Sequence, residues 1–195
     1  MENTNLIKSC QSGDLDSFNK LYQLYSKNAL GTAYLISNQK GIADDIVQEA
    51  FIECFKKIKK LKNPEAFEVW FYKLLVRTGW RMVKKYNRFI PMDDKNIEDM
   101  NTTVSLDSKL DASETNMVVN EALEKLNLPL KTVVILYYFN DLSIEEISKV
   151  LGCFQGTVKS RLYNARKQLY KALNENKQYD QTTNLFVSIK KGVKA

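Results

Sequence analysis

Histidine is absent from this 195-residue chain, and glycine, proline and cysteine are scarce, at seven, three and three residues. Without histidine, the sequence excludes Ser-His-Asp and Cys-His catalytic arrangements and nearly every mixed Cys/His zinc site. The few glycines form neither of the glycine-rich loops that bind nucleotide phosphates. We therefore expect no enzyme, no catalytic residue, no metal and no cofactor.

Long hydrophobic runs are also missing. The longest stretch without a charged residue is the twelve residues 28–39, well short of the roughly 20 apolar residues that cross a bilayer. The start of the chain lacks the basic-then-apolar pattern of a signal peptide. The three cysteines, Cys10, Cys54 and Cys153, lie far apart without a Cys-x-x-Cys motif, as buried free thiols in a reducing compartment would. We expect a cytoplasmic protein that does not insert into a membrane.

The chain is rich in positive charge, with a net charge of +6 that is unevenly distributed. Residues 61–90 carry seven basic and two acidic side chains, and residues 129–173 carry seven and three. Residues 91–128, which lie between these two segments, carry three basic and nine acidic side chains. Two basic segments around an acidic one indicate contact with a polyanion at two places, nucleic acid before anionic lipid. Solvated helix faces would give the same composition, so charge alone leaves that alternative open.

The hydrophobic pattern predicts an all-α protein of two small helical domains joined by an acidic flexible linker. Apolar residues recur at three and four over residues 15–88, with one helix beginning near Pro64. Residues 91–113 are acidic and have no sustained period, which is typical of a linker. The domains are then residues 1–90 and 114–173, with a C-terminal tail of unknown role at 174–195. Two stripes of the first domain are expected to face its core: Phe18, Leu21, Tyr22, Tyr25, Ile46, Val47, Ala50, Phe51, Cys54, Phe55 and Ile58.

A helix-turn-helix unit is predicted in residues 141–173. Ser143 and Glu146 have the spacing of a capping box, and Gly152 is well placed to end the helix that they begin. The apolar positions of the following helix share one face: Val158, Leu162, Ala165 and Leu169. The opposite face carries short hydrogen-bonding side chains between cations, which suits DNA base edges bracketed by phosphates. An ordinary surface helix is the alternative.

Three motifs carry a family resemblance. Residues 143–147 (Ser-Ile-Glu-Glu-Ile), 156–162 (Gly-Thr-Val-Lys-Ser-Arg-Leu) and 165–166 (Ala-Arg) closely resemble the promoter-reading helix-turn-helix of bacterial sigma factors of the extracytoplasmic-function group. Residues 43–51 are similar to the polymerase-docking helix of that group, and residues 67–74 to its promoter-melting helix. The motifs occur in the family's order and cover roughly residues 8–173.

Two positions depart from the family pattern. Phe154 and Gln155 stand where the family commonly has a small polar residue or proline, which gives the recognition helix an unusual cap. Asn164 stands where the family commonly has arginine, which predicts a different base preference.

The resemblance implies a sigma factor that recruits core RNA polymerase, directs initiation at promoters and is restrained by an anti-sigma factor. Its docking helix would meet the clamp helices of the largest polymerase subunit through an acidic outer face: Asp44, Asp45, Gln48, Glu49 and Ile52. The recognition helix would bind the −35 promoter element through Thr157, Lys159, Ser160, Arg161, Tyr163, Asn164, Arg166 and Lys167.

The helix after Pro64 carries cations at intervals of three or four, and two tryptophans lie on the same stripe. Cations follow phosphates and indole rings stack on unpaired bases, so this stripe suits the strand exposed when a duplex opens. We expect Trp80 to lie outside the apolar arc, whereas Trp70, beside Phe71 and Leu74, also fits a core position. By resemblance, the −10 element would be bound and melted by Lys60, Lys62, Asn63, Trp70, Lys73, Arg77, Trp80, Arg81, Lys84 and Arg88.

Two other functions stay open at this point. A self-sufficient helix-turn-helix regulator would bind an operator as a dimer, tightly and without polymerase. A nucleic-acid-processing enzyme would cleave in a metal-dependent way, but it needs inward-facing acids from several segments. Without the resemblance, the acids around Asp44 read more simply as a solvated helix face.

Overall fold

The computed structural model describes the backbone of residues 2–89 and 114–175, with the side chains of residues 3–87 and 119–173. The first domain contains α1 (Glu2–Ser12), α2 (Leu15–Ser37), α3 (Lys40–Lys57), two short 3₁₀ turns (Ile58–Lys60 and Pro64–Ala66) and α4 (Phe67–Phe89). The second contains α5 (Glu114–Glu124), α6 (Leu128–Val134), a π-helical segment (Ile135–Phe139), α7 (Ile144–Leu151) and α8 (Gln155–Glu175). No strand occurs in these ranges. The predicted all-α fold with two helical domains is confirmed, while the predicted linker and the tail beyond residue 175 lie outside the described residues.

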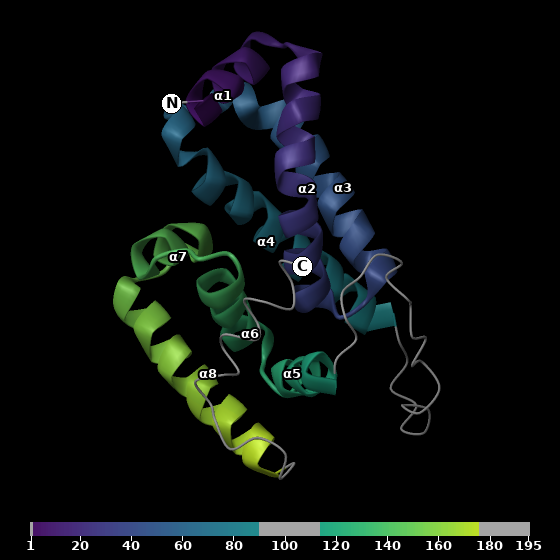
Figure 1. Cartoon of the computed structure of the whole chain (residues 1–195), viewed down its shortest axis with the longest axis vertical. Helices are drawn as coiled ribbons and strands as arrows, with labels where there is room; N and C mark the ends of the chain where they lie inside the picture. The colour runs from purple at the N-terminus through teal and green to yellow at the C-terminus, as the bar shows by residue number, and fades with distance from the viewer. Residues whose placement is uncertain (1, 90–113, 176–195) are drawn as a thin grey trace.

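In the first domain, α2, α3 and α4 pack against one another, and α1 packs on one end of α2 (Figure 1). Local signals set the ends of these helices. Asp14 caps α2 by accepting a hydrogen bond from the Asp16 amide at 3.1 Å. Asn38 ends α2 in the left-handed conformation, with φ at 56°, and turns the chain toward α3. Asn63 and Pro64 begin the turn that leads into α4.

Fewer residues are buried in the core of the first domain than the sequence predicted. Ile46, Ala50 and Cys54 are fully buried between α2 and α4. The prediction that Tyr22 and Phe55 face the core is wrong, because these rings are 44% and 47% exposed at the edge of the α2–α3 contact. Helical periodicity shows that a residue lies on an apolar arc, but it does not show how much of that arc a neighbouring helix covers.

In the second domain, the predicted helix-turn-helix is confirmed. The Ser143 hydroxyl accepts a hydrogen bond from the Glu146 amide at 3.2 Å, and the Glu146 carboxylate accepts one from the Ser143 amide at 2.8 Å. Gly152 ends α7 with φ at 66°, a conformation that glycine adopts at little cost. The apolar face of α8 is buried against α6 and α7: Val158, Leu162, Ala165 and Leu169.

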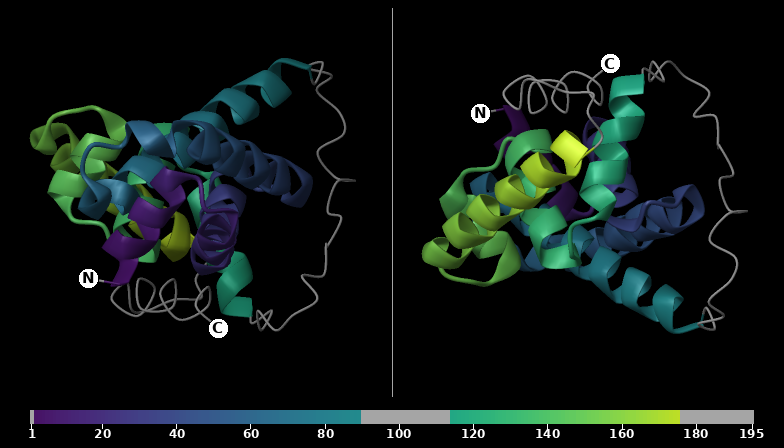
Figure 2. Two further views of the ribbon diagram at one scale, coloured as in Figure 1. Left: turned by 90° about the horizontal axis from the view of Figure 1, so that it is seen from above. Right: turned by 90° about the horizontal axis from the view of Figure 1, so that it is seen from below.

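The two domains pack directly against each other, with α7 on α4 and the π-helical segment on α2 (Figures 1 and 2). The Asn140 side-chain amide donates hydrogen bonds to the hydroxyl oxygens of Thr32 at 2.8 Å and of Tyr72 at 2.9 Å. The indole N–H of Trp80 donates to the Thr132 hydroxyl at 2.9 Å. Thr32 and Thr132 are completely buried. Polar groups as well as apolar ones therefore hold this contact.

Candidate functional site

The outer face of α3 is acidic. Asp44, Asp45 and Gln48 are exposed there, and Ile52 is 39% exposed. Ala43, Ile46, Val47 and Ala50 lie buried on the opposite side. The structure thus brings the predicted polymerase-binding residues to one exposed surface. A protein partner with basic side chains and a small apolar group can bind such a surface.

Glu49 differs from the other acids of α3. It is half-buried, and its carboxylate lies 3.4 Å from the guanidinium of Arg81 on α4. Both side chains are partly exposed, so the pair adds little to stability. It does show that the acidic face of α3 and the basic face of α4 are neighbours.

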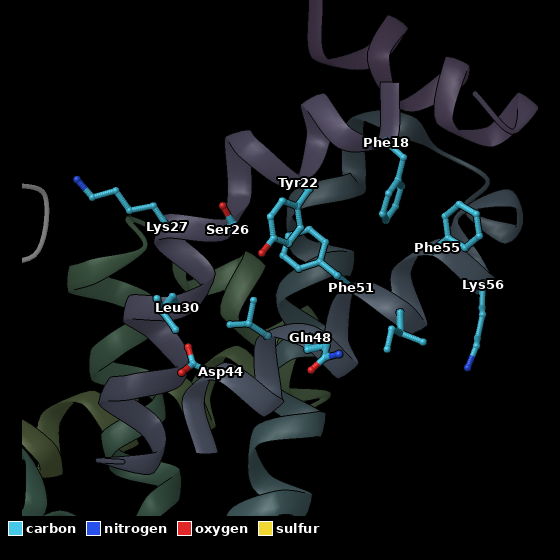
Figure 3. A pocket seen from close by; sticks show the side chains of 12 residues that line it. Phe18, Tyr22, Ser26, Lys27, Leu30, Asp44, Gln48, Phe51, Phe55 and Lys56 are labelled. Atoms are coloured by element: carbon cyan, nitrogen blue, oxygen red, sulfur yellow. The ribbon is translucent and has the colours of Figure 1, made fainter. Parts of the chain in front are cut away.

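A groove of about 830 Å³ lies between α2 and α3, beside the acidic face (Figure 3). Aromatic rings form its wall: Phe18 packs edge-on against Phe55 at 5.0 Å between ring centroids, and Tyr22 lies 4.7 Å from Phe51. Asp44, Gln48 and Ile52 also line it. Sequence reasoning missed this groove. The only signal was that two aromatic residues lie at the edges of the apolar stripes next to an acidic helix.

The residues predicted to bind the −10 element lie on α4 and on the turn before it. Arg77, Arg81 and Lys84 are exposed, and Lys73 is half-buried. In the turn, Lys60, Lys62 and Asn63 are exposed; the Asn63 side chain already accepts a hydrogen bond from the Glu65 amide at 3.0 Å. Arg88 lies on α4, but its side chain is outside those described.

The two tryptophans of α4 lie in different surroundings. Trp70 is half-buried, with its ring 5.9 Å from that of Phe67, so it has both a packed and an open side. The expectation that Trp80 lies outside the apolar arc of α4 is wrong. It is half-buried and hydrogen-bonded to Thr132 of the second domain. The periodicity of α4 alone could not show that the other domain covers this part of the helix.

On α8, most of the predicted −35 residues are exposed, and Thr157 and Arg161 are half-buried. The exposed ones are Lys159, Ser160, Tyr163, Asn164, Arg166 and Lys167. Opposite the buried arc, hydroxyl and amide groups alternate with cations as the sequence predicted. This is the combination that reads base edges while holding phosphates.

Arg166 is held in place by two residues that sequence reasoning missed. Its Nε donates a hydrogen bond to the Tyr138 hydroxyl at 2.9 Å. Its guanidinium carbon lies 5.8 and 5.7 Å from the ring centroids of Tyr137 and Tyr138, within cation–π range. A fixed guanidinium loses less conformational entropy when it binds a phosphate.

Among the described residues, no group of three or more Cys, Asp or Glu side chains converges as a metal site needs. Cys10 and Cys54 are buried, as predicted, but Cys153 is only half-buried. Burial raises the pKa of Cys54 to about 12 and also raises that of Cys10. Neither buried thiol is therefore a nucleophile at neutral pH. Within the described part of the chain, no helix is both long and apolar enough to span a bilayer.

Comparison with known proteins connects these surfaces to a family. Residues 21–89 match the family model described as Sigma-70 region 2, and residues 116–169 match Sigma-70, region 4. RNA polymerase sigma factor SigV of Bacillus subtilis is 34% identical over 162 residues, which cover 83% of this chain and 87% of that protein. The ECF RNA polymerase sigma-E factor of Haemophilus influenzae is 29% identical over 175 residues, covering 84% and 91%.

Two solved structures have the same fold. One is CnrH in complex with the cytosolic domain of CnrY, with a TM-score of 0.66 and 19% identity over 89% of this chain and 97% of that one. The other is the sigma factor RpoE in complex with the anti-sigma factor NepR from Bartonella quintana, with a TM-score of 0.66 and 23% identity over 80% and 96%.

Proposed function

Because the chain belongs to the bacterial RNA polymerase sigma factors of the extracytoplasmic-function group, we propose that its two domains divide promoter recognition between them. The family consists of DNA-recognition subunits, so the chain binds core polymerase and directs initiation rather than catalysing a reaction. In our proposal, residues 114–173 bind the −35 element, while residues 1–90 dock on polymerase and bind the −10 element. The observation that carries this division is the pair of exposed basic surfaces on α4 and α8, one in each domain.

The −35 proposal assigns separate roles within α8. Ser160, Tyr163 and Asn164 are exposed and uncharged, so they contact base edges without adding general affinity for DNA. Arg166, already oriented by Tyr138, contacts a phosphate. Replacing Asn164 with Arg should change the preferred −35 bases, since Asn favours adenine and Arg favours guanine by roughly 1–3 kcal/mol for each good pair.

The −10 proposal places the cations of α4 on the phosphates of the melted strand and Trp80 on an unpaired base. Trp80 reaches that base only after its hydrogen bond to Thr132 breaks. Trp80→Ala should therefore impair open-complex formation more than closed-complex binding, because base stacking, at roughly 1–3 kcal/mol per base, is gained only after melting. Permanganate footprinting at matched occupancy tests this; equal melting by the two proteins contradicts it.

The polymerase proposal assigns the acidic face of α3 to the largest subunit of the core enzyme. Asp45→Lys should greatly reduce pull-down of core polymerase without changing helix content. Glu121→Lys, on the exposed surface of α5, is the matched charge-reversal control and should bind normally. Core binding by Asp45→Lys at the level of the control contradicts this assignment.

One experiment tests the function as a whole. The purified chain, core polymerase and their mixture are each incubated with a library of randomised promoter DNA, and the bound and transcribed sequences are determined. A sigma factor selects promoters only together with core enzyme. Tight selection of an operator by the chain alone would support the stand-alone regulator instead.

A restraining partner is also part of the proposal. Both solved structures of similar fold are complexes, one of them with a protein described as an anti-sigma factor. We assign to this chain a partner of the same kind and a cytoplasmic location beside RNA polymerase. Co-purification of the chain from growing cells, followed by mass spectrometry, tests for that partner.

A further inference from the structure

Phe154 is the most exposed large apolar side chain in the described part of the protein, with 86% of its surface accessible. It directly precedes α8, and its carbonyl oxygen accepts hydrogen bonds from the amides of Thr157 at 2.9 Å and Val158 at 3.2 Å. The residue therefore occupies the cap position of the recognition helix. At this position a polar side chain normally accepts a hydrogen bond from a backbone amide in the first turn, and a phenylalanine side chain cannot do so.

The helix before it shows the contrast. Ser143 has the same position on α7 and closes a complete capping box with Glu146. Phe154 supplies neither a capping bond nor a substantial buried surface, so neither folding requirement accounts for it. An isolated exposed aromatic residue is ordinary on a protein surface, and what sets this one apart is its place in the helix-turn-helix.

In helix-turn-helix proteins, the N-terminal residues of the second helix contact base edges in the major groove. Phe154 stands at that end of α8. Gly156, on the same end, has no atom within 4 Å of where a Cβ would lie, apart from its chain neighbours and the backbone of α8 itself. Gly156 follows Phe154 by two residues and adds no side chain at this end of α8, which leaves room for close approach of a base pair.

We propose that Phe154 recognises the methyl group of a thymine in the −35 element, an inference that rests on the proposed role of α8. A phenyl ring forms no conventional hydrogen bond with a base edge. In the major groove, the thymine C5-methyl is the apolar group that distinguishes one base from the others. Phe154 thus adds apolar readout to the polar readout by Ser160 and Asn164. The departure from the family pattern at this position then alters promoter choice.

The test uses the holoenzyme and a promoter selected from a randomised library. Each thymine of the −35 element, on either strand, is replaced in turn by deoxyuridine, which lacks only the methyl group. For wild type, one replacement should weaken binding about fourfold, the value expected for one buried methyl. Phe154→Ala should bind the thymine and deoxyuridine promoters with equal affinity. Phe154→Leu should keep part of the preference for the thymine promoter. Tyr170→Ala, which removes a 54% exposed ring farther along α8, is the matched control and should keep all of it.

Three results would overturn the inference. Wild type could bind all deoxyuridine promoters as it binds the parent, the selected −35 element could contain no thymine, or Phe154→Ala could weaken every promoter while keeping the full thymine preference. The third result would indicate that the ring packs on the DNA backbone instead of on a thymine methyl group. Failure of the holoenzyme to select any promoter is a different outcome, since it contradicts the proposed function itself.

Discussion

Asn140 joins the two domains, and replacing it with Ala tests how firmly they are held together. Its amide donates to the hydroxyls of Thr32 and Tyr72, which are 0% and 2% exposed. The Thr32 hydroxyl keeps its own bond to the Asn28 carbonyl at 2.8 Å, whereas among the described residues Asn140 alone donates to the Tyr72 hydroxyl. When the domains separate, water reaches both hydroxyls, so the substitution penalises the closed arrangement alone.

The size of the effect follows from these contacts. Losing a neutral hydrogen bond costs about 1 kcal/mol, and leaving a buried hydroxyl unsatisfied costs roughly 1–3 kcal/mol. Together they disfavour the closed arrangement by roughly 2–4 kcal/mol, which shifts its equilibrium with the open one by about 30- to 1000-fold. Adding Tyr72→Phe to Asn140→Ala should restore part of the stability of the closed arrangement, because it removes the hydroxyl that Asn140→Ala leaves unpaired.

Small-angle X-ray scattering and calorimetry measure this directly. Asn140→Ala should increase the radius of gyration and split a single unfolding transition into two, one for each domain. Asn19→Ala, an exposed position on α2, is the control and should change neither. An unchanged radius of gyration and a single unshifted transition for Asn140→Ala would refute the reasoning.

Three further predictions concern stability and reactivity. Burial lowers the pKa of Lys131 below its usual 10.5. At neutral pH the buried charge therefore reduces the free energy of unfolding, and this destabilisation decreases as the pH rises through the lowered pKa. Lys131→Met should therefore melt at a higher temperature than wild type at pH 7, and the difference should shrink toward pH 10; a difference that grows with pH contradicts this. Ser143→Ala removes the capping box and should lower the free energy of unfolding by about 1 kcal/mol in urea titrations; no loss would show that the cap is not stabilising. Under native conditions Ellman's reagent should modify Cys153 first and Cys54 last, because burial raises the Cys54 pKa to about 12; peptide mapping that finds Cys54 modified first is the contrary result.

The helix-turn-helix could be predicted from the sequence because its signals are local. Ser143, Glu146 and Gly152 act within a few residues of one another, so their spacing is enough to place the ends of α7. The buried arc of α8 likewise repeats within one helix. Most of the site residues of α3 and α8 lie on exposed faces, as predicted, for the same reason, whereas Glu49, Thr157 and Arg161 are half-buried. Their contacts with polymerase and DNA remain predictions.

The features that escaped prediction depend on which helix lies next to which. Tyr22 and Phe55 sit at the edge of an apolar arc, and only the packing angle of α2 on α3 decides that they line a groove. Trp80 has the sequence position of a solvent-facing residue, but the second domain covers part of it and hydrogen-bonds to its indole N–H. Asn140 gave no signal at all, since a lone asparagine after an apolar run belongs to no local pattern.

The packing of α4 on α7 has a consequence for the length of DNA that the chain can span. Elements centred near −10 and −35 are about 25 base pairs apart, or roughly 85 Å along the duplex at 3.4 Å per base pair. Here α7 contacts both α4 and α8, and packed helix axes lie roughly 8–10 Å apart, so the axes of α4 and α8 are separated by only about 20 Å where they flank α7. The chain from residue 89 to residue 114 reaches at most roughly 90 Å when fully extended, which is long enough for the domains to separate. In the proposed function, occupying both elements therefore requires the Asn140 and Trp80 contacts to break, and their free energy is subtracted from the affinity for the promoter.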